Sequence, residues 1–307
     1  MAAAGFAEDP LLARPVVLAE RRAKRPHPTG VQDCPFCPGR EGDTPPAKLV
    51  YVVKQSGVLE LSDREASRVQ GWAVRCFDNL YPIVPPELGG HEVVVETPLH
   101  DEHPHKARVE QLALALKAAL SRMNALYACG ASYVALFRNH GREAGASIPH
   151  PHTQLVALPF IPRSISSELK AFKQGCPLCR GLGEPFLEGR GFIAAVPEAP
   201  LQPYEFRLYP RVHEPSPLGL SNEGLVELAR TLRRALAALA EALNDPPYNL
   251  WLHAAPPSEG WEAYHWHIEV RPRLSVHAGL EQGFEVYVCS KPPSEAAEEL
   301  KAALRPR

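Results

Sequence analysis

The sequence lacks any apolar run long enough to cross a membrane as a helix. Such a helix needs about 20 consecutive apolar residues, and no stretch of the chain approaches that length. The first 20 residues include Glu8 and Asp9 and have no sustained apolar core, so they fit neither a secretory signal nor a transit peptide. We therefore expect a cytoplasmic protein with no membrane partner.

An excess of charge of either sign is also missing. The 33 Lys and Arg residues nearly balance the 35 Asp and Glu residues, which gives a formal net charge of -2. A protein that binds nucleic acid or an anionic membrane surface usually has a basic excess, so neither partner is expected. The seven cysteines are an odd number in a chain without an export signal, which argues against a disulfide framework.

What remains is the composition of a loop-rich globular protein. Of the 307 residues, 45% are hydrophobic and 22% are charged, and both values are near globular averages. The 33 prolines are about twice the usual share and predict frequent loops. A chain of this length is expected to form two domains or one large one.

A repeated pattern of cysteines and histidines divides the chain into two halves. Each half contains a CxxC pair, then a single histidine, then an HxH pair. These residues are Cys34, Cys37, His100, His150 and His152 in the first half and Cys176, Cys179, His213, His265 and His267 in the second. Because the single histidine and the HxH pair are similarly spaced in both halves, we predict a duplication, with domains over residues 1–165 and 166–307.

Local patterns predict both strands and helices. Short segments rich in β-branched or aromatic residues indicate strands over residues 91–97, 134–137, 153–160, 204–210, 248–252, 266–272 and 284–289. Leu- and Ala-rich segments with helical spacing indicate helices over residues 108–129, 222–244 and 295–304, the last two preceded by the candidate N-caps Ser221 and Ser294. We expect an α+β fold in which each half is a mostly antiparallel sheet with helices.

The repeated cysteines and histidines are typical of metal sites. Two thiolates and two imidazoles are a ligand set that a closed tetrahedral zinc site prefers. The predicted first site is Cys34, Cys37, His100 and His150, and the predicted second site is Cys176, Cys179, His213 and His265. A redox role is less favoured, because no thioredoxin-like βαβ context surrounds the cysteines. The second site could instead hold iron or remain empty.

The segment from Asn139 to Gln154 has the highest density of reactive side chains. If residues 150–156 form a strand, His150, His152 and Gln154 share one face, so His150 can bind metal while His152 faces a substrate. Gly141, Gly145 and Ser147 can offer backbone N–H groups and a hydroxyl to phosphate oxygens. A neutral imidazole beside such a cradle is a candidate nucleophile. Alternatively, the histidines of this segment are metal ligands or core residues.

Gln154 indicates which chemistry follows the attack. A glutamine can hydrogen-bond a phosphoryl oxygen but cannot transfer protons as a histidine does, which favours a covalent intermediate that waits for a second phosphate acceptor. The matching positions in the second half are His267 and Glu269. That face could close a partner site or be a polar strand face.

These residues together resemble the galactose-1-phosphate uridylyltransferase family of the histidine-triad superfamily and its sibling, ADP-glucose phosphorylase. The resemblance extends over most of the chain and implies two histidine-triad-like domains, a homodimer and zinc. It also implies roles for residues that pattern alone does not single out. Those expected to bind substrate are Arg22, Arg25, Asn79, Asn139, Ser147, Glu285 and Lys291, with His152 as nucleophile and Gln154 orienting the phosphoryl group.

The function that the resemblance implies is ping-pong nucleotidyl transfer. His152 is expected to attack the α-phosphorus of UDP-glucose and form a uridylyl-histidine, from which galactose 1-phosphate takes the UMP group. The alternatives are an ADP-glucose or dinucleoside-polyphosphate phosphorylase, a histidine-triad hydrolase, and a non-enzymatic zinc-binding interaction module. The Gly-rich stretch that usually follows Gly283-Phe284-Glu285 is shortened to residues 286–293, so the resemblance does not identify the hexose phosphate.

Overall fold

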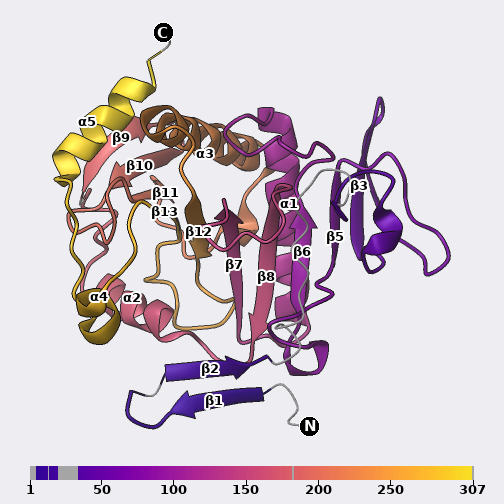
Figure 1. Cartoon of the computed structure of the whole chain (residues 1–307), viewed down its shortest axis with the longest axis horizontal. Helices are drawn as coiled ribbons and strands as arrows, with labels where there is room; N and C mark the ends of the chain where they lie inside the picture. Colours follow the sequence, from indigo (N-terminus) through magenta and orange to yellow (C-terminus); the bar gives the residue numbers. More distant parts are fainter. Residues whose placement is uncertain (1–4, 13, 20–33, 182, 306–307) are drawn as a thin grey trace.

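A single antiparallel sheet of 11 strands extends through most of the protein (Figure 1). The computed structural model describes residues 5–12, 14–19, 34–181 and 183–305. Within them the strand order is β4-β3-β5-β6-β8-β7-β12-β13-β11-β10-β9, and a separate hairpin pairs β1 with β2. The protein is therefore α+β, as predicted, and the sheet is continuous across the two halves of the chain.

The strands are β1 (Gly5–Asp9), β2 (Arg14–Leu18), β3 (Leu49–Lys54), β4 (Gly57–Leu61), β5 (Val74–Asp78), β6 (His91–Val95), β7 (Tyr133–His140), β8 (His152–Leu158), β9 (Glu184–Glu188), β10 (Phe192–Val196), β11 (Phe206–Pro210), β12 (Tyr248–His253) and β13 (His267–Pro272). The α-helices are α1 (Val109–Ala128), α2 (Arg163–Lys173), α3 (Asn222–Leu243), α4 (Gly279–Phe284) and α5 (Pro293–Ala303). Short 3-10 helices are η3 (Glu41–Asp43), η4 (Pro86–Leu88) and η5 (Pro217–Gly219).

The two halves have the same topology. In the first, β5, β6, α1, β7 and β8 follow one another along the chain and the strands lie in the order β5-β6-β8-β7; in the second, β10, β11, α3, β12 and β13 give the order β10-β11-β13-β12. The halves meet where β7 pairs with β12. The predicted boundary after residue 165 falls inside α2 and stays a prediction.

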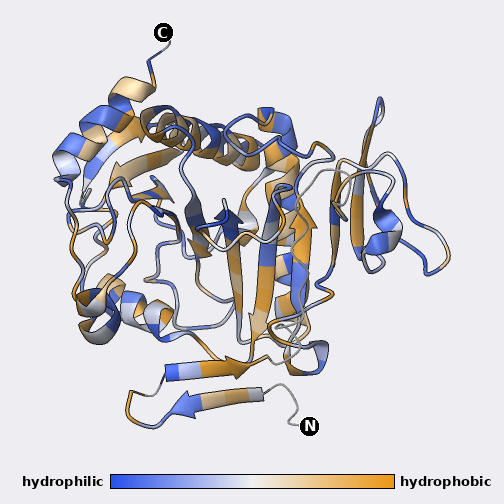
Figure 2. Cartoon of the chain, in the orientation of Figure 1, coloured by the Kyte–Doolittle hydropathy of each residue, from blue (hydrophilic) through white to orange (hydrophobic). Residues whose placement is uncertain are grey.

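The two long helices cover one face of the sheet. The buried side of α1 and α3 packs with Leu136, Leu155 and Leu250 of the central strands in one large core. Ser221 caps α3 by accepting a hydrogen bond from the backbone N–H of Gly224 at 3.1 Å, as predicted. Since side chains alternate along a strand, Leu155 on the helix side leaves His152 and Gln154 on the opposite face. Figure 2 shows the hydropathy of the residues along these strands and helices.

Two of the local expectations are wrong. Residues 284–289 were expected to form a strand, but α4 ends at Phe284 and the following residues pair with no strand in the described part of the chain. Phe284 and Val288 are 75% and 62% exposed, so the local alternation lacks the buried face that a strand needs. The other error concerns α5, which begins at Pro293 with Pro292 as N-cap, so Ser294 is not its cap.

No helix among the described residues has the length and apolar character needed to span a membrane.

Candidate active site and metal sites

His152 is the first residue of β8 and lies between β6 and β7. Its side chain is 3% exposed, and its Nδ1 is 2.8 Å from the carbonyl oxygen of His150. A carbonyl can only accept a hydrogen bond, so Nδ1 carries the proton and Nε2 keeps its lone pair. The carbonyl oxygen of His150 therefore fixes the tautomer of His152.

Gln154 lies two residues along the same strand and contacts His91 of β6. The Gln154 Oε1 atom is 3.1 Å from His91 Nε2, and the backbone N–H of Ile83 donates to His91 Nδ1 at 3.1 Å. Nδ1 is therefore the acceptor of that ring, and Nε2–H donates to Gln154. The Asn79 amide nitrogen is 3.3 Å from the same His91 Nε2, so His91 contacts two of the predicted site residues, although two N–H donors do not form a hydrogen bond with each other.

The loop after β7 connects that strand to β8, which begins with His152. Gly141 and Gly145 have φ angles of +80° and +86°, a region that L side chains rarely adopt. A Cβ on Gly141 would also lie 2.6 Å from Cβ of Pro247, so this position requires glycine. The Ser147 hydroxyl at the end of the loop is buried and has no hydrogen-bond partner within the described residues. An unpartnered buried hydroxyl of this kind is suited to a ligand oxygen.

The four residues of the predicted first metal site converge. Their ligand atoms all lie within 4.8 Å of one another. The Sγ atom of Cys37 is 3.4 Å from Nδ1 of His100 and 3.5 Å from Nδ1 of His150, and Sγ of Cys34 is 3.7 Å from the latter. On its other side, His150 Nε2 donates to the carbonyl oxygen of Thr97 at 2.8 Å.

The second predicted site has the same arrangement in a more exposed place. Cys176 Sγ lies 3.2 Å from Nδ1 of His265, while Cys179 Sγ lies 3.3 Å from Nδ1 of His213 and 3.5 Å from Nδ1 of His265. His265 Nε2 donates to the carbonyl oxygen of Pro210 at 3.0 Å, which matches the bond from His150 to Thr97.

Both groups fit a tetrahedral ion of the size of zinc. Zinc–sulfur bonds of about 2.3 Å and zinc–nitrogen bonds of about 2.0–2.1 Å place sulfur and nitrogen ligands about 3.5 Å apart. Burial lowers the pKa of His150 and of His265 to about 4 and raises the pKa of the Cys34 thiol to about 11. The imidazoles are therefore neutral and able to bind metal, whereas Cys34 must lose a proton when an ion binds.

A third group of potential ligands lies on the second half of the sheet. Glu168, His253, His267 and Glu269 have ligand atoms within 4.8 Å of one another. His253 Nδ1 pairs with Glu168 at 2.8 Å, and Glu269 accepts from Arg207 at 2.8 Å. His267 Nδ1 is 3.1 Å from the His265 carbonyl oxygen, which repeats the bond between His152 and His150. The group could hold a cation, but its carboxylates already have cationic partners.

Burial and charge have opposite effects on the pKa values in this third group. Burial alone raises the pKa of Glu269, but the charges of His267, His253 and Arg207 lower it to about 2. Burial alone lowers the pKa of His253, and the hydrogen bond and charge of Glu168 raise it above its usual value. The local charges therefore favour an ionised carboxylate beside a protonated imidazole.

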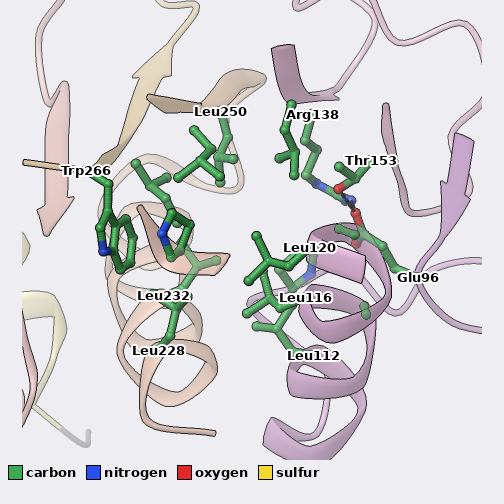
Figure 3. A pocket seen from close by; sticks show the side chains of 17 residues that line it. Glu96, Leu112, Leu116, Leu120, Arg138, Thr153, Leu228, Leu232, Leu250 and Trp266 are labelled. Carbon is green, nitrogen blue, oxygen red and sulfur yellow. Dashed lines mark hydrogen bonds and ion pairs between the residues drawn. The ribbon is translucent and has the colours of Figure 1, made fainter. Parts of the chain in front are cut away.

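A buried ion pair lies behind His152, on the helix side of the sheet. Arg138 of β7 contacts Glu96 at 2.5 Å, and Glu96 also accepts from the hydroxyl of Thr153 at 2.7 Å. Arg138 donates to the carbonyl oxygen of His152 at 3.5 Å. Figure 3 shows these three side chains at one wall of a cavity of about 50 Å³, with Trp266 at the other.

Several predicted residues lie elsewhere or outside the described structure. Arg22 and Arg25 lie outside the described residues. Glu285 pairs with Arg14 of the β1–β2 hairpin, and Lys291 pairs with Glu299 at 2.6 Å and with Glu295 at 3.4 Å. None of these contacts involves the residues around His152, so the structure does not bring Glu285 or Lys291 to His152 within one chain.

Sequence reasoning missed several residues that the structure places at the site. The ring of Phe36, between the two cysteines of the first site, is 5.4 Å from that of His152 in an edge-to-face arrangement. Its place inside the CxxC pair was a signal, since a metal bound by the two cysteines would fix that turn. His91 gave only the weak signal of a histidine that begins an apolar strand, and Glu168 of α2 gave none.

Comparison with known proteins identifies the family. Residues 107–306 match the family described as Domain of unknown function (DUF4921). An ADP-glucose phosphorylase of Arabidopsis thaliana is 29% identical over 96% of this chain and 91% of its own length. A galactose-1-phosphate uridylyltransferase of Thermotoga maritima is 28% identical over 95% of this chain and 96% of its own length.

Solved structures give the same result. A crystal structure of an ADP-glucose phosphorylase from Arabidopsis thaliana with bound ADP-glucose is 28% identical, covers 98% of each chain and has a TM-score of 0.79. A uridylyltransferase structure is 30% identical, covers 97% of this chain and 98% of its own, and has a TM-score of 0.81. The chain therefore belongs to the DUF4921 family and is a nucleotidyltransferase of the galactose-1-phosphate uridylyltransferase and ADP-glucose phosphorylase type.

Proposed function

We propose that the protein transfers the nucleoside monophosphate of a nucleotide sugar to a second phosphate acceptor through a covalent bond to His152. The observation that carries this proposal is the 2.8 Å hydrogen bond from His152 Nδ1 to the His150 carbonyl oxygen. It leaves the lone pair on Nε2, and a neutral imidazole attacks phosphorus without a prior proton transfer.

The reaction balances in two displacement steps. In the first, the Nε2–P bond forms and the bond between the α-phosphorus and the oxygen of the sugar phosphate breaks, so that glucose 1-phosphate leaves. In the second, a phosphate oxygen of the acceptor attacks the same phosphorus and the Nε2–P bond breaks. Nδ1 keeps its proton throughout, because the His150 carbonyl oxygen accepts it as a hydrogen bond.

The surrounding groups are suited to stabilise the charge that develops on the phosphoryl oxygens. Gln154 accepts from His91 through Oε1, so its NH₂ group is the end left to donate. The buried hydroxyl of Ser147 and the amide of Asn139 supply two further donors from the loop after β7. Fixed donors of this kind lower the energy of a charged transition state, and Arg22 and Arg25 would add positive charge.

The donor that we favour is UDP-glucose, with galactose 1-phosphate as acceptor. Uridylyltransferases supply several of the relatives, including the structure with a TM-score of 0.81. The second candidate is transfer of AMP from ADP-glucose to phosphate. It is supported by the ADP-glucose phosphorylase that matches 96% of this chain and by the contacts of Glu285 and Lys291, which lie away from His152.

Zinc is the metal that we propose for the two Cys₂His₂ groups, with iron as an alternative for the second. A tetrahedral ion bound by four protein ligands has no open position, so it would supply rigidity rather than reaction chemistry. At the first site it would fix His150, whose carbonyl oxygen holds His152.

We also propose a homodimer in the cytoplasm. The support for a second copy is the exposed apolar surface of residues 276–288, where Val276 is 94% exposed and Phe284 is 75% exposed. Sedimentation equilibrium would test it: a monomer at all concentrations would contradict the dimer.

Product analysis tests the donor and the acceptor together. The protein would be incubated with UDP-glucose plus galactose 1-phosphate and, separately, with ADP-glucose plus inorganic phosphate, and the nucleotides separated by chromatography. UDP-galactose in the first reaction supports uridylyl exchange, and ADP in the second supports the phosphorylase. A His152→Asn variant with full transfer activity would contradict both.

A further inference from the structure

Asn249 occupies the seam between the two halves and contacts a residue of the proposed phosphate site. It lies in β12 directly opposite Asn139 of β7 and is 8% exposed. Its amide nitrogen donates to Oδ1 of Asn139 at 2.8 Å and to the carbonyl oxygen of Ala144 at 2.8 Å, while its Oδ1 accepts from Nε of Arg273 at 2.5 Å. The amide therefore has a partner at both ends.

Two of these contacts fix the orientation of the Asn249 amide without ambiguity. A backbone carbonyl can only accept and a guanidinium N–H can only donate, so the NH₂ group must face Ala144 and the oxygen must face Arg273. The same NH₂ group faces Asn139. It follows that the atom of Asn139 turned toward Asn249 is its oxygen, although the two ends of an asparagine amide are otherwise hard to distinguish.

This orientation decides which end of Asn139 a ligand can meet. With Oδ1 held by Asn249, the NH₂ group of Asn139 is turned away from β12, and Nδ2 lies 3.9 Å from the position of a Cβ built on Gly145. It therefore faces the same loop that ends at the unpartnered hydroxyl of Ser147. The second bond of Asn249, to Ala144, holds that loop to the seam.

We propose that Asn249, oriented by Arg273, is a positioning residue that directs the NH₂ group of Asn139 and the loop of residues 141–147 toward the phosphoryl group. A residue of the second half of the chain thus contributes to the reaction at the proposed nucleophile, which lies in the first half. The inference rests on the proposed function, since it assigns Asn139 and Ser147 to a phosphoryl ligand.

The test is Asn249→Asp, which keeps the size of the side chain and a partner for Arg273. A carboxylate cannot donate to Asn139 or to Ala144, and it attracts the NH₂ group of Asn139, so the Asn139 amide turns its oxygen toward the ligand. We expect the single-turnover rate of nucleotidyl transfer to His152 to fall about 10- to 100-fold. The exposed Asn222→Asp, which keeps its acceptor for Lys117, is the matched control and should retain the wild-type rate.

A double-mutant cycle with Asn139→Ala separates positioning from a general structural role. If Asn249 acts through Asn139, Asn249→Asp lowers the rate much less in the Asn139→Ala background than in the wild type. Equal effects in both backgrounds, or a wild-type rate for Asn249→Asp alone, would overturn the inference.

A readout that does not need the covalent step keeps the two proposals distinct. Absence of any adduct on the wild type with UDP-glucose or ADP-glucose would count against the proposed function. In that case, equilibrium binding of UMP and AMP would test the inference. Asn249→Asp should weaken this binding about 10-fold or more, and unchanged binding would overturn the inference.

Discussion

At the scale of single residues, each functional side chain has an orientation set by a partner of unambiguous polarity. The His150 carbonyl oxygen fixes the tautomer of His152, and the backbone N–H of Ile83 fixes that of His91. His91 in turn fixes the amide of Gln154. The first of these bonds is predictable from sequence because its two residues lie only two apart in the chain. The bond between His91 and Gln154 is not, because it depends on how β6 is aligned against β8.

Gln154→His tests the proposed reason for a glutamine at this position. A histidine here can accept and transfer a proton, so water should compete better with the phosphate acceptor. We predict that release of free UMP or AMP from the covalent intermediate rises roughly tenfold or more. Quenched-flow chromatography of the preloaded protein without acceptor measures this release, and an adduct as long-lived as that of the wild type would contradict the assigned role.

At the scale of elements, three neighbouring segments meet at the ion pair behind His152. Glu96 follows β6 and precedes Thr97, Arg138 precedes Asn139 on β7, and Thr153 lies between His152 and Gln154 on β8. The ion pair lies on the helix side of the sheet. It therefore links the strands whose opposite face carries the site residues. Its existence could not be predicted, because no spacing in the sequence indicates which buried charges will meet.

Removing one member of this pair should be costly. Glu96→Leu leaves the Arg138 guanidinium buried without its carboxylate, a change that typically costs about 3–5 kcal/mol. Replacing both, as Glu96→Leu with Arg138→Met, removes the unpaired charge and should recover much of that loss. Urea unfolding measures both variants, and a double variant no more stable than the single one would contradict this account.

The two Cys₂His₂ groups could be predicted because the same order of a CxxC pair, a single histidine and an HxH pair occurs twice. We expect Cys37→Ser to lower the transfer rate more than Cys179→Ser, since only the first site includes His150, whose carbonyl oxygen holds His152. Both substitutions should lower the apparent Tm by roughly 5 °C or more. Metal content, Tm and transfer rate would be measured together. Equal transfer rates in the two variants would contradict the link between the first site and the nucleophile.

At the scale of the whole molecule, the duplicated sheet places unlike sites on equivalent strands. His152 with Gln154 and His267 with Glu269 occupy matching positions on β8 and β13, and each histidine bonds the carbonyl oxygen two residues before it. Their surroundings differ, because Glu269 is paired with Arg207. The sequence predicted the duplication from spacing. It could not predict that both halves share one sheet, since that depends on the pairing of β7 with β12.

A histidine cluster near the end of β7 should make stability depend on pH. Burial and nearby positive charges, including Arg138, lower the pKa of His140, and they lower the pKa of His103 to about 2. Burial also lowers the pKa of His105 to about 4, although the charge of Asp245 opposes this shift. The unfolded chain takes up protons near pH 6.5. These groups therefore favour folding above that pH, and their contribution is lost progressively as the pH falls below it.

We predict that the free energy of unfolding decreases between pH 7 and pH 5 and that His105→Gln makes this dependence shallower. Urea unfolding at a series of pH values would show it, with His277→Gln, outside the cluster, as the control. An unchanged slope in the His105→Gln protein would contradict the assignment.

The most direct test of the central claim is intact-protein mass spectrometry after brief incubation with UDP-glucose, UDP-galactose, ADP-glucose or a dinucleoside tetraphosphate, each alone. The account predicts that at least one donor adds a single UMP or AMP to the wild-type chain, that peptide mapping locates it on His152, and that His152→Asn gains no mass. Turnover without any adduct, or an adduct on another residue, would contradict it.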